Sequence, residues 1–159
     1  MTMIRPATAA DVPTVLRFIR ELADYEREPH AVEATEASLT DALFGPSPGA
    51  EAVMAEVDGA PAGFAIFFHN FSTWTGKRGL YLEDLYVTPD ARGRGVGKAL
   101  LRHLAALAVA RDCARFEWSV LDWNAPAIAF YDSVGAESME GWTVRRLHGD
   151  ALRTLAGVA

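Results

Sequence analysis

The sequence predicts an α/β fold of the α+β kind, formed by one domain over residues 1–159. Segments with apolar residues at helical spacing alternate with short apolar runs that are typical of strands. An Asp58-Gly59 pair separates two such runs, which indicates a hairpin. A basic, glycine-rich turn over residues 92–98 joins another run to an amphipathic helix. Together these observations predict one sheet flanked by helices.

The first predicted elements are a strand over residues 1–6 and two helices. Thr8, with the acidic Asp11 three places on, is typical of a helix start, and apolar residues at helical spacing continue to about Tyr25. A second, shorter helix is predicted from Thr35 to the glycine- and proline-rich break at residues 45–49.

Three strands follow in the prediction, over residues 52–57, 63–69 and 80–87. Between the last two lies a segment of turn character, residues 70–79, which carries Phe71 and Trp74. A loop of this length with aromatic residues is often a lid or a pocket wall. Packing of both aromatic side chains in the core is the alternative.

The remaining elements alternate between helix and strand. We expect a helix from 96 to about 111, a strand over 116–121, and a helix that Asn124 caps and Gly135 ends. Two closing strands and a short helix from about Asp150 complete the chain. The predicted order is strand, helix, helix, three strands, helix, strand, helix and two strands, before that final helix.

Composition narrows the classes of function. The net charge of −6 disfavours general binding to nucleic acid or to anionic membrane, and suits a small cationic substrate better. No apolar run approaches the roughly 18 residues of a membrane span, and the first residues lack a secretory signal, so we expect a cytoplasmic protein. One cysteine, Cys113, and four scattered histidines predict no metal site.

The glycine-rich turn predicts a binding site for a pyrophosphate. Its glycines let backbone N–H groups converge on an anion at the start of a helix, and its basic side chains add positive charge. The spacing matches neither the dinucleotide fingerprint, which needs a third glycine, nor a Walker loop, since Ala99 follows Gly97-Lys98 where a hydroxyl residue belongs. ATP and NAD are therefore poor candidates.

The hexapeptide at residues 92–97, Arg-Gly-Arg-Gly-Val-Gly, resembles motif A of the GNAT superfamily of N-acetyltransferases, R/Q-x-x-G-x-G/A. Four further blocks resemble its diamine (spermidine/spermine) branch, which includes thialysine acetyltransferases: residues 4–11, 21–26, 79–87 and 123–131. The resemblance implies the GNAT fold, a mixed, mostly antiparallel sheet of six to seven strands whose fourth and fifth strands splay apart.

The resemblance also implies an activity. The chain would move an acetyl group from acetyl-CoA to a primary amine of a small cationic molecule, by direct transfer in a ternary complex. A polyamine or diamine and an amino acid of thialysine or lysine type both remain open as acceptors. Alternatives are transfer to a protein N-terminus or lysine, and a non-catalytic acyl-CoA-binding regulatory module. Family members are commonly homodimers, so a homodimer is expected.

Site residues are carried over from the resemblance by position. Glu83 would accept the proton of the amine and Tyr131 would protonate the leaving thiolate. Strand alternation would point Glu83 and Asp84 to opposite faces unless a bulge intervenes. The residues expected to contact the acceptor are Tyr25, Glu26, Asp84, Glu117, Trp118 and Ser119.

The residues expected to bind acetyl-CoA lie in three segments. The fourth strand would offer its backbone to the pantetheine, the glycine turn would hold the diphosphate, and the helix after Asn124 would add contacts. These residues are Leu85, Tyr86, Val87, Arg92, Gly93, Arg94, Gly95, Val96, Gly97, Lys98, Asn124, Pro126, Ala127 and Ser133. Beside the proposed acceptor site, residues 27–32 depart from the acidic pattern of the animal diamine enzymes.

Overall fold

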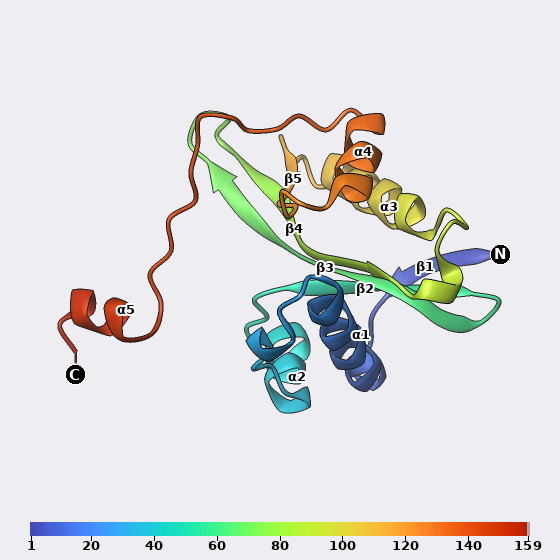
Figure 1. Ribbon diagram of the computed structural model, residues 1–159, viewed down its shortest axis with the longest axis horizontal. Helices are drawn as coiled ribbons and strands as arrows, with labels where there is room; N and C mark the ends of the chain where they lie inside the picture. The colour runs from blue at the N-terminus through green and yellow to red at the C-terminus, as the bar shows by residue number, and fades with distance from the viewer. Residues whose placement is uncertain (159) are drawn as a thin grey trace. The chain divides into compact units, whose positions relative to one another are not determined.

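The computed structural model describes residues 1–158, which form two compact units, Met1–Leu121 and the residues from Asp122 onward (Figure 1). The first unit contains a five-stranded sheet in the order β1-β2-β3-β4-β5. Strands β1 to β4 are antiparallel neighbours, and β5 joins β4 in parallel. The strands are β1 (Thr2–Pro6), β2 (Glu51–Val57), β3 (Ala60–Ser72), β4 (Lys77–Val87) and β5 (Phe116–Trp118).

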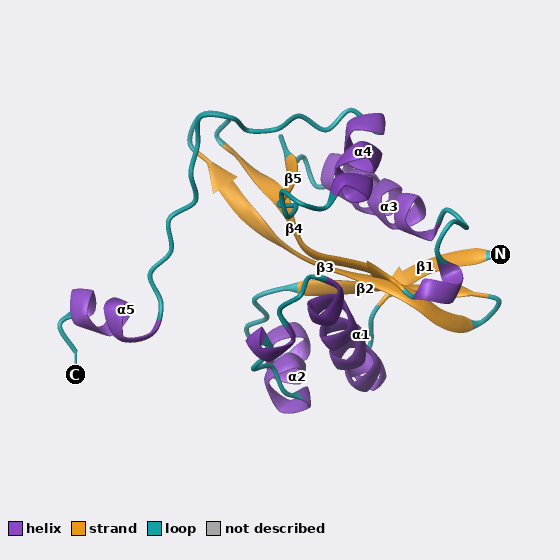
Figure 2. Ribbon diagram, in the orientation of Figure 1, coloured by secondary structure: helices purple, strands orange, loops and turns teal. Residues whose placement is uncertain are grey.

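Helices cover both faces of this sheet in the first unit. In Figure 2, α1 (Val12–Tyr25) and α2 (Glu36–Phe44) lie on one face, and α3 (Val96–Ala110) lies on the other. The second unit contains α4 (Ala125–Ser133) and α5 (Gly149–Ala156). None of the described helices has the length and apolar character needed to cross a membrane.

The core between α1, α2 and the sheet explains the apolar spacing of α1. Phe18 is fully buried, and its ring lies 5.8 Å from that of Phe64 on β3 and 5.5 Å from that of Tyr86 on β4. Burying such side chains contributes about 1.5–3 kcal/mol each. The buried cluster on this face consists of Val12, Val15, Leu16, Phe18, Leu39, Leu43, Ala52, Met54, Phe64, Ile66 and Tyr86.

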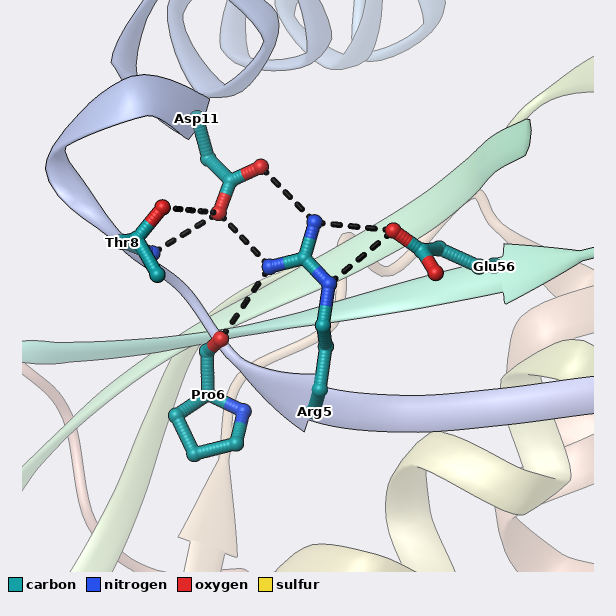
Figure 3. A network of polar contacts seen from close by, with 5 residues as sticks. All are labelled: Arg5, Pro6, Thr8, Asp11 and Glu56. Carbon is teal, nitrogen blue, oxygen red and sulfur yellow. Dashed lines mark hydrogen bonds and ion pairs between the residues drawn. The ribbon is translucent and has the colours of Figure 1, made fainter. Parts of the chain in front are cut away.

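A polar network fixes the passage from β1 into α1 (Figure 3). Arg5 donates from both terminal nitrogens to Asp11, at 2.8 and 2.9 Å, and from Nε to Glu56 on β2 at 2.9 Å. Asp11 also accepts from the backbone N–H of Thr8 at 2.7 Å, as predicted for a helix start. The hydrogen bonds from Arg5 lower the pKa of Asp11 to about 2. A 3-10 turn, Ala9–Asp11, precedes the α-helix.

The hairpin of β3 and β4 is longer than predicted. Both strands extend into the expected loop, so only residues 73–76 lie outside them. Phe71 and Trp74 are 67% and 81% exposed, so neither packs in the core. The alternating pattern was too weak there to separate a strand with two solvated faces from a loop.

The prediction of two closing strands is wrong for the described residues. Residues 136–148 contain no strand, and the sheet has five strands instead of six or seven. Trp142 and Val144 have the spacing of a strand, yet they are 71% and 85% exposed. A strand needs a neighbour for its backbone groups, and residue spacing does not reveal whether one is present. The fifth strand is also shorter than predicted, since it ends at Trp118.

Candidate active site

The glycine-rich turn leads directly into the first turn of α3. Gly93 and Gly95 have φ angles of +75° and +79°, in the left-handed region that favours glycine, and Gly95 is the N-cap of α3. The first N–H groups of an α-helix have no acceptor within the helix, and the helix dipole places positive charge there. This end of α3 therefore has the backbone geometry of an anion site.

The three basic side chains around this turn differ in their surroundings. Arg94 and Lys98 are exposed, and Arg94 forms a long ion pair of 3.5 Å with Asp58 of the β2–β3 turn. Arg92 donates from Nε to the carbonyl oxygen of Val87 at 3.0 Å, and its guanidinium lies over the ring of Tyr25 at 5.4 Å. Arg94 and Lys98 are thus the better placed of the three to meet a phosphate from solvent.

The second half of β4 has an open backbone edge. Strand β5 pairs only with Leu80, Tyr81 and Leu82, so β4 continues beyond the end of its parallel neighbour. The N–H of Thr88 donates to Ala62 of β3 at 2.9 Å. Because backbone groups alternate in direction along a strand, those of Leu85 and Val87 point away from β3. The Val87 carbonyl oxygen already accepts from Arg92, which leaves the Leu85 groups and the Val87 N–H for an extended ligand to pair with as an additional strand would.

A β-bulge lies at the start of this open half. Asp84 pairs with Ile66 and Leu82 pairs with Phe67, which leaves Glu83 as an extra residue in β4. The bulge interrupts the alternation of side chains, so Glu83 and Asp84 line the same cavity and do not face opposite sides of the sheet. Two carboxylates adjacent in sequence thereby reach one site.

That cavity has a volume of about 420 Å³ and combines acidic and apolar walls. The carboxylates come from β4, from the end of α1 and from the turn after it: Glu26, Glu28, Glu33, Glu83 and Asp84. The apolar lining is Ile19, Leu22, Ala23, Ala31, Val32, Ala34 and Leu121. Among the described residues, this lining contains no lysine, arginine or histidine. The cavity therefore suits a cation that has an aliphatic portion.

Burial, and second to it the charge of neighbouring carboxylates, raises the pKa values of Asp84 and Glu26. Burial, followed by repulsion from Glu83 and Glu26, raises the pKa of Asp84 from 3.8 to about 6. Burial and the charge of Glu83 also raise the pKa of Glu26. A carboxyl that titrates near neutral pH can accept a proton from a substrate more readily than an ordinary surface carboxylate.

Three expected acceptor contacts on β5 and beyond lie outside the lining of this cavity. Glu117 lines a separate, smaller cavity between the hairpin and residues 114–115. The ring of Trp118 lies 5.0 Å from that of Phe116, and the Ser119 Oγ lies 2.9 Å from the Tyr81 hydroxyl. Of the residues predicted to contact the acceptor, Glu26 and Asp84 line the acidic cavity, together with Glu83, the predicted proton acceptor. Tyr25 is not part of this lining.

The predicted residues around α4 belong to the second unit. The Asn124 side chain accepts from the N–H of Ala127 at 3.4 Å, and so caps α4 as predicted, with Pro126 in the first turn. The ring of Tyr131 lies 5.6 Å from that of Phe130, and Ser133 Oγ donates to the Phe130 carbonyl oxygen at 2.6 Å. The acidic cavity itself is lined entirely by residues of the first unit.

Sequence reasoning missed two of the five carboxylates in the cavity. Glu28 and Glu33 flank the short 3-10 turn Pro29–Ala31 that follows α1. The positive charge of Arg27 and the rigid Pro29 argued against an acidic site in this segment. Its two glutamates would have indicated one. Arg27 has a φ of +65°, which turns the chain sharply between Glu26 and Glu28.

Comparison with known proteins identifies the family. The sequence profile of the acetyltransferase (GNAT) family matches residues 15–136, most of the chain. This chain belongs to the GNAT family. It is therefore an acetyltransferase, and members of this family use acetyl-CoA as cosubstrate.

Relatives of this GNAT chain match over nearly its full length. A thialysine N-epsilon-acetyltransferase from Mus musculus is 38% identical, over 98% of this chain and 98% of its own length. An L-ornithine N5-acetyltransferase from Arabidopsis thaliana is 31% identical, over 96% of this chain and 86% of its own. An integron cassette protein from the V. cholerae mobile metagenome has a TM-score of 0.81 and 28% identity, over 98% and 97% of the two chains.

Proposed function

We propose that this GNAT protein acetylates a primary amine of a small cationic molecule, by direct transfer from acetyl-CoA in a ternary complex. The proposal rests on the carboxylate pair at the β4 bulge, Glu83 and Asp84. Both residues line the acidic cavity, and the free backbone edge of the same strand lies beside them. Pantetheine paired with the edge at Leu85 and Val87 would bring a thioester close to the carboxylates that hold the amine.

The chemical step begins with loss of a proton from the ammonium group. A lysine-like amine has a pKa near 10.4, so its nitrogen is almost fully protonated at neutral pH and cannot attack. In our proposal Glu83 and Asp84 accept this proton, directly or through water. The free nitrogen lone pair then forms a C–N bond to the thioester carbonyl carbon, and the C–S bond breaks to release the CoA thiolate. The nitrogen loses its second proton to water as the amide forms.

Two further groups would assist this step. A backbone N–H on the open edge of β4 can donate to the thioester oxygen, where negative charge develops. Tyr131 would protonate the departing thiolate, a role proposed from the family resemblance and from the match of the block around it. The diphosphate would be bound by the turn at residues 93–98, with further contacts from Asn124 and its helix.

The cavity favours a small diamine or polyamine as the acceptor. Its five carboxylates would attract a second ammonium group, and the apolar wall would contact the aliphatic chain between the two groups. Amino acids of thialysine or ornithine type are the second candidate, because the names of two relatives state such activities. Their carboxylate would be repelled by the acidic lining, so we expect them to bind more weakly.

A thiol-release screen tests the proposal. The purified protein is mixed with acetyl-CoA and, in turn, with aliphatic diamines, polyamines, lysine analogues and peptides, and CoA release is followed. We expect release with at least one small amine, and a lower KM for diamines than for amino acids. Release with peptides alone would indicate a protein acceptor. Tight CoA binding without release in the whole panel would indicate a binding module.

We also propose a homodimer, on the family resemblance.

A further inference from the structure

Arg92 contacts two aromatic rings and a carbonyl group, all from its own chain. Its guanidinium carbon lies 5.4 Å from the ring centre of Tyr25, at the end of α1, and 5.8 Å from that of Tyr86, on β4. Its Nε donates to the carbonyl oxygen of Val87 at 3.0 Å. A planar guanidinium can stack on aromatic faces and hydrogen-bond in its plane at once, which an ammonium cannot.

The Tyr86 side of this contact is rigidly held. The Tyr86 hydroxyl donates to Glu21 Oε2 at 2.7 Å, and the Tyr86 ring packs against Phe18 of α1. Tyr86 is buried, with 5% of its surface exposed. Arg92 therefore lies on a platform that belongs to the core.

The Tyr25 side leads directly to the acidic cavity. Tyr25 is the last residue of α1, and Glu26 is its C-cap and lines the cavity. The next residue, Arg27, adopts a positive φ, and Glu28 beyond it lines the cavity again. The position of Tyr25 thus influences where two of the five carboxylates lie.

We propose that Arg92 is a positioning residue for the acceptor site. By stacking on Tyr25 it fixes the end of α1, and with it Glu26 and Glu28, relative to β4. Its main role is then not to bind the diphosphate, although it begins the glycine-rich motif. The kinetic part of this inference rests on the proposed function, whereas the structural part does not.

Two variants with the same change of charge separate these roles. Arg92→Gln removes the stacked guanidinium, and Arg94→Gln removes a neighbouring guanidinium that forms an ion pair with Asp58. For Arg92→Gln we expect KM for the acceptor amine to rise about five- to tenfold, and the Kd of acetyl-CoA to change less than about twofold. Arg94→Gln should do the reverse and weaken acetyl-CoA binding about fivefold or more.

Hydrogen exchange provides a readout that does not depend on activity. Amides of residues 22–28 should exchange faster in Arg92→Gln than in the wild type, and at the wild-type rate in Arg94→Gln. Tyr25→Leu should accelerate the same amides, and adding it to Arg92→Gln should cause no further increase. Arg92→Lys keeps the charge without the planar stack, so it should behave as Arg92→Gln does.

Two results would show that Arg92 does not position the acceptor site. Unchanged exchange at residues 22–28 in Arg92→Gln would overturn the inference, as would full recovery of the acceptor KM and of exchange in Arg92→Lys. Arg92 is exposed, so its variants should fold, and circular dichroism verifies this. If the wild type acetylates no amine, the proposed function fails. The exchange data still test whether Arg92 fixes the end of α1.

Discussion

The first half of β4 ends with residues 80–82, which have a strand on each side, whereas β5 does not pair with the second half, from Glu83 to Val87. In the first half, Leu80 and Leu82 are 0% and 3% exposed and serve the core. The bulge at Glu83 divides the two halves. One strand thus combines a segment that stabilises the fold with a segment that leaves backbone and carboxyl groups available for chemistry.

The largest effect should follow from a change at the start of the open half. Asp84→Asn should lower kcat for the best amine about 100- to 10,000-fold, because the amide cannot accept the ammonium proton. Glu83→Gln should have a smaller effect, because Glu83 is exposed and a water molecule can replace it as a proton acceptor. Steady-state kinetics on matched, folded samples would measure both, and the reverse ranking would assign the proton acceptor to Glu83.

The pH dependence of wild-type kcat/KM should reflect the titration of Asp84. Because the pKa of Asp84 is about 6, its deprotonated fraction falls as the pH drops below that value. The value of kcat/KM should therefore decrease toward acid pH with an apparent pKa near 6, and Asp84→Asn should lose this step. A step that persists unchanged in Asp84→Asn would contradict the assignment.

The paired half should respond to mutation through stability. Leu80→Ala should lower the free energy of unfolding by about 2–5 kcal/mol, because it opens a cavity beneath a fully buried position. Denaturant unfolding followed by circular dichroism would measure the loss. The kcat of the folded fraction should change little, in contrast to Asp84→Asn. A large fall in kcat would show that the two halves are not separable.

Two aspartates should affect stability in opposite directions. Arg5 lowers the pKa of Asp11, so the stability it provides is present above 3.8 and is lost as the pH falls toward about 2. The pKa of Asp84 is raised, so the native state retains a proton that the unfolded chain has lost, and stability falls as the pH rises from 3.8 to about 6.

Unfolding experiments at pH 7 and pH 4 would test this contrast. At pH 7, Asp11→Asn should cost about 1–3 kcal/mol, since it leaves part of the Arg5 network without its acceptor. Asp84→Asn should leave stability unchanged or raise it at pH 7, and this gain should shrink at pH 4. A stabilising Asp11→Asn, or a destabilising Asp84→Asn, would contradict the predicted signs.

The smallest effect should come from the glycine turn that follows the open half. Gly95→Ala should cost about 1–2 kcal/mol, because φ is +79° there, although an added Cβ would meet no atom within 4 Å. Gly97→Ala is the matched control: its Cβ would lie 3.7 Å from Val87, an ordinary contact, and alanine favours a helix. Denaturant unfolding should separate the two, and equal costs would contradict a conformational cause.

The local elements were largely predictable from residue spacing and capping. Thr8 and Asp11 form the predicted helix start, and Asn124 caps α4. Gly135, with a φ of +88°, follows the end of α4 as expected. These features depend on neighbours within four residues, which the sequence displays directly.

Other features depended on distant parts of the chain. The bulge exists because β3 and β4 pair in two different registers on either side of Glu83, which the sequence of β4 alone does not reveal. The closing strands were predicted from alternation, yet the described residues 136–148 form no strand. Glu28 and Glu33 became part of the cavity through the turn after α1, and were missed.

The sequence by itself determined the order of most elements, their caps, and the glycine-rich turn whose motif marks the family, because periodicity, capping and backbone freedom are local properties. Only the tertiary structure decided that Asp84 joins Glu83 and Glu26 in one cavity, and that Arg92 stacks between two elements. The physical reason is that burial, repulsion between carboxylates and aromatic stacking act through space, between residues as far apart as positions 26 and 84.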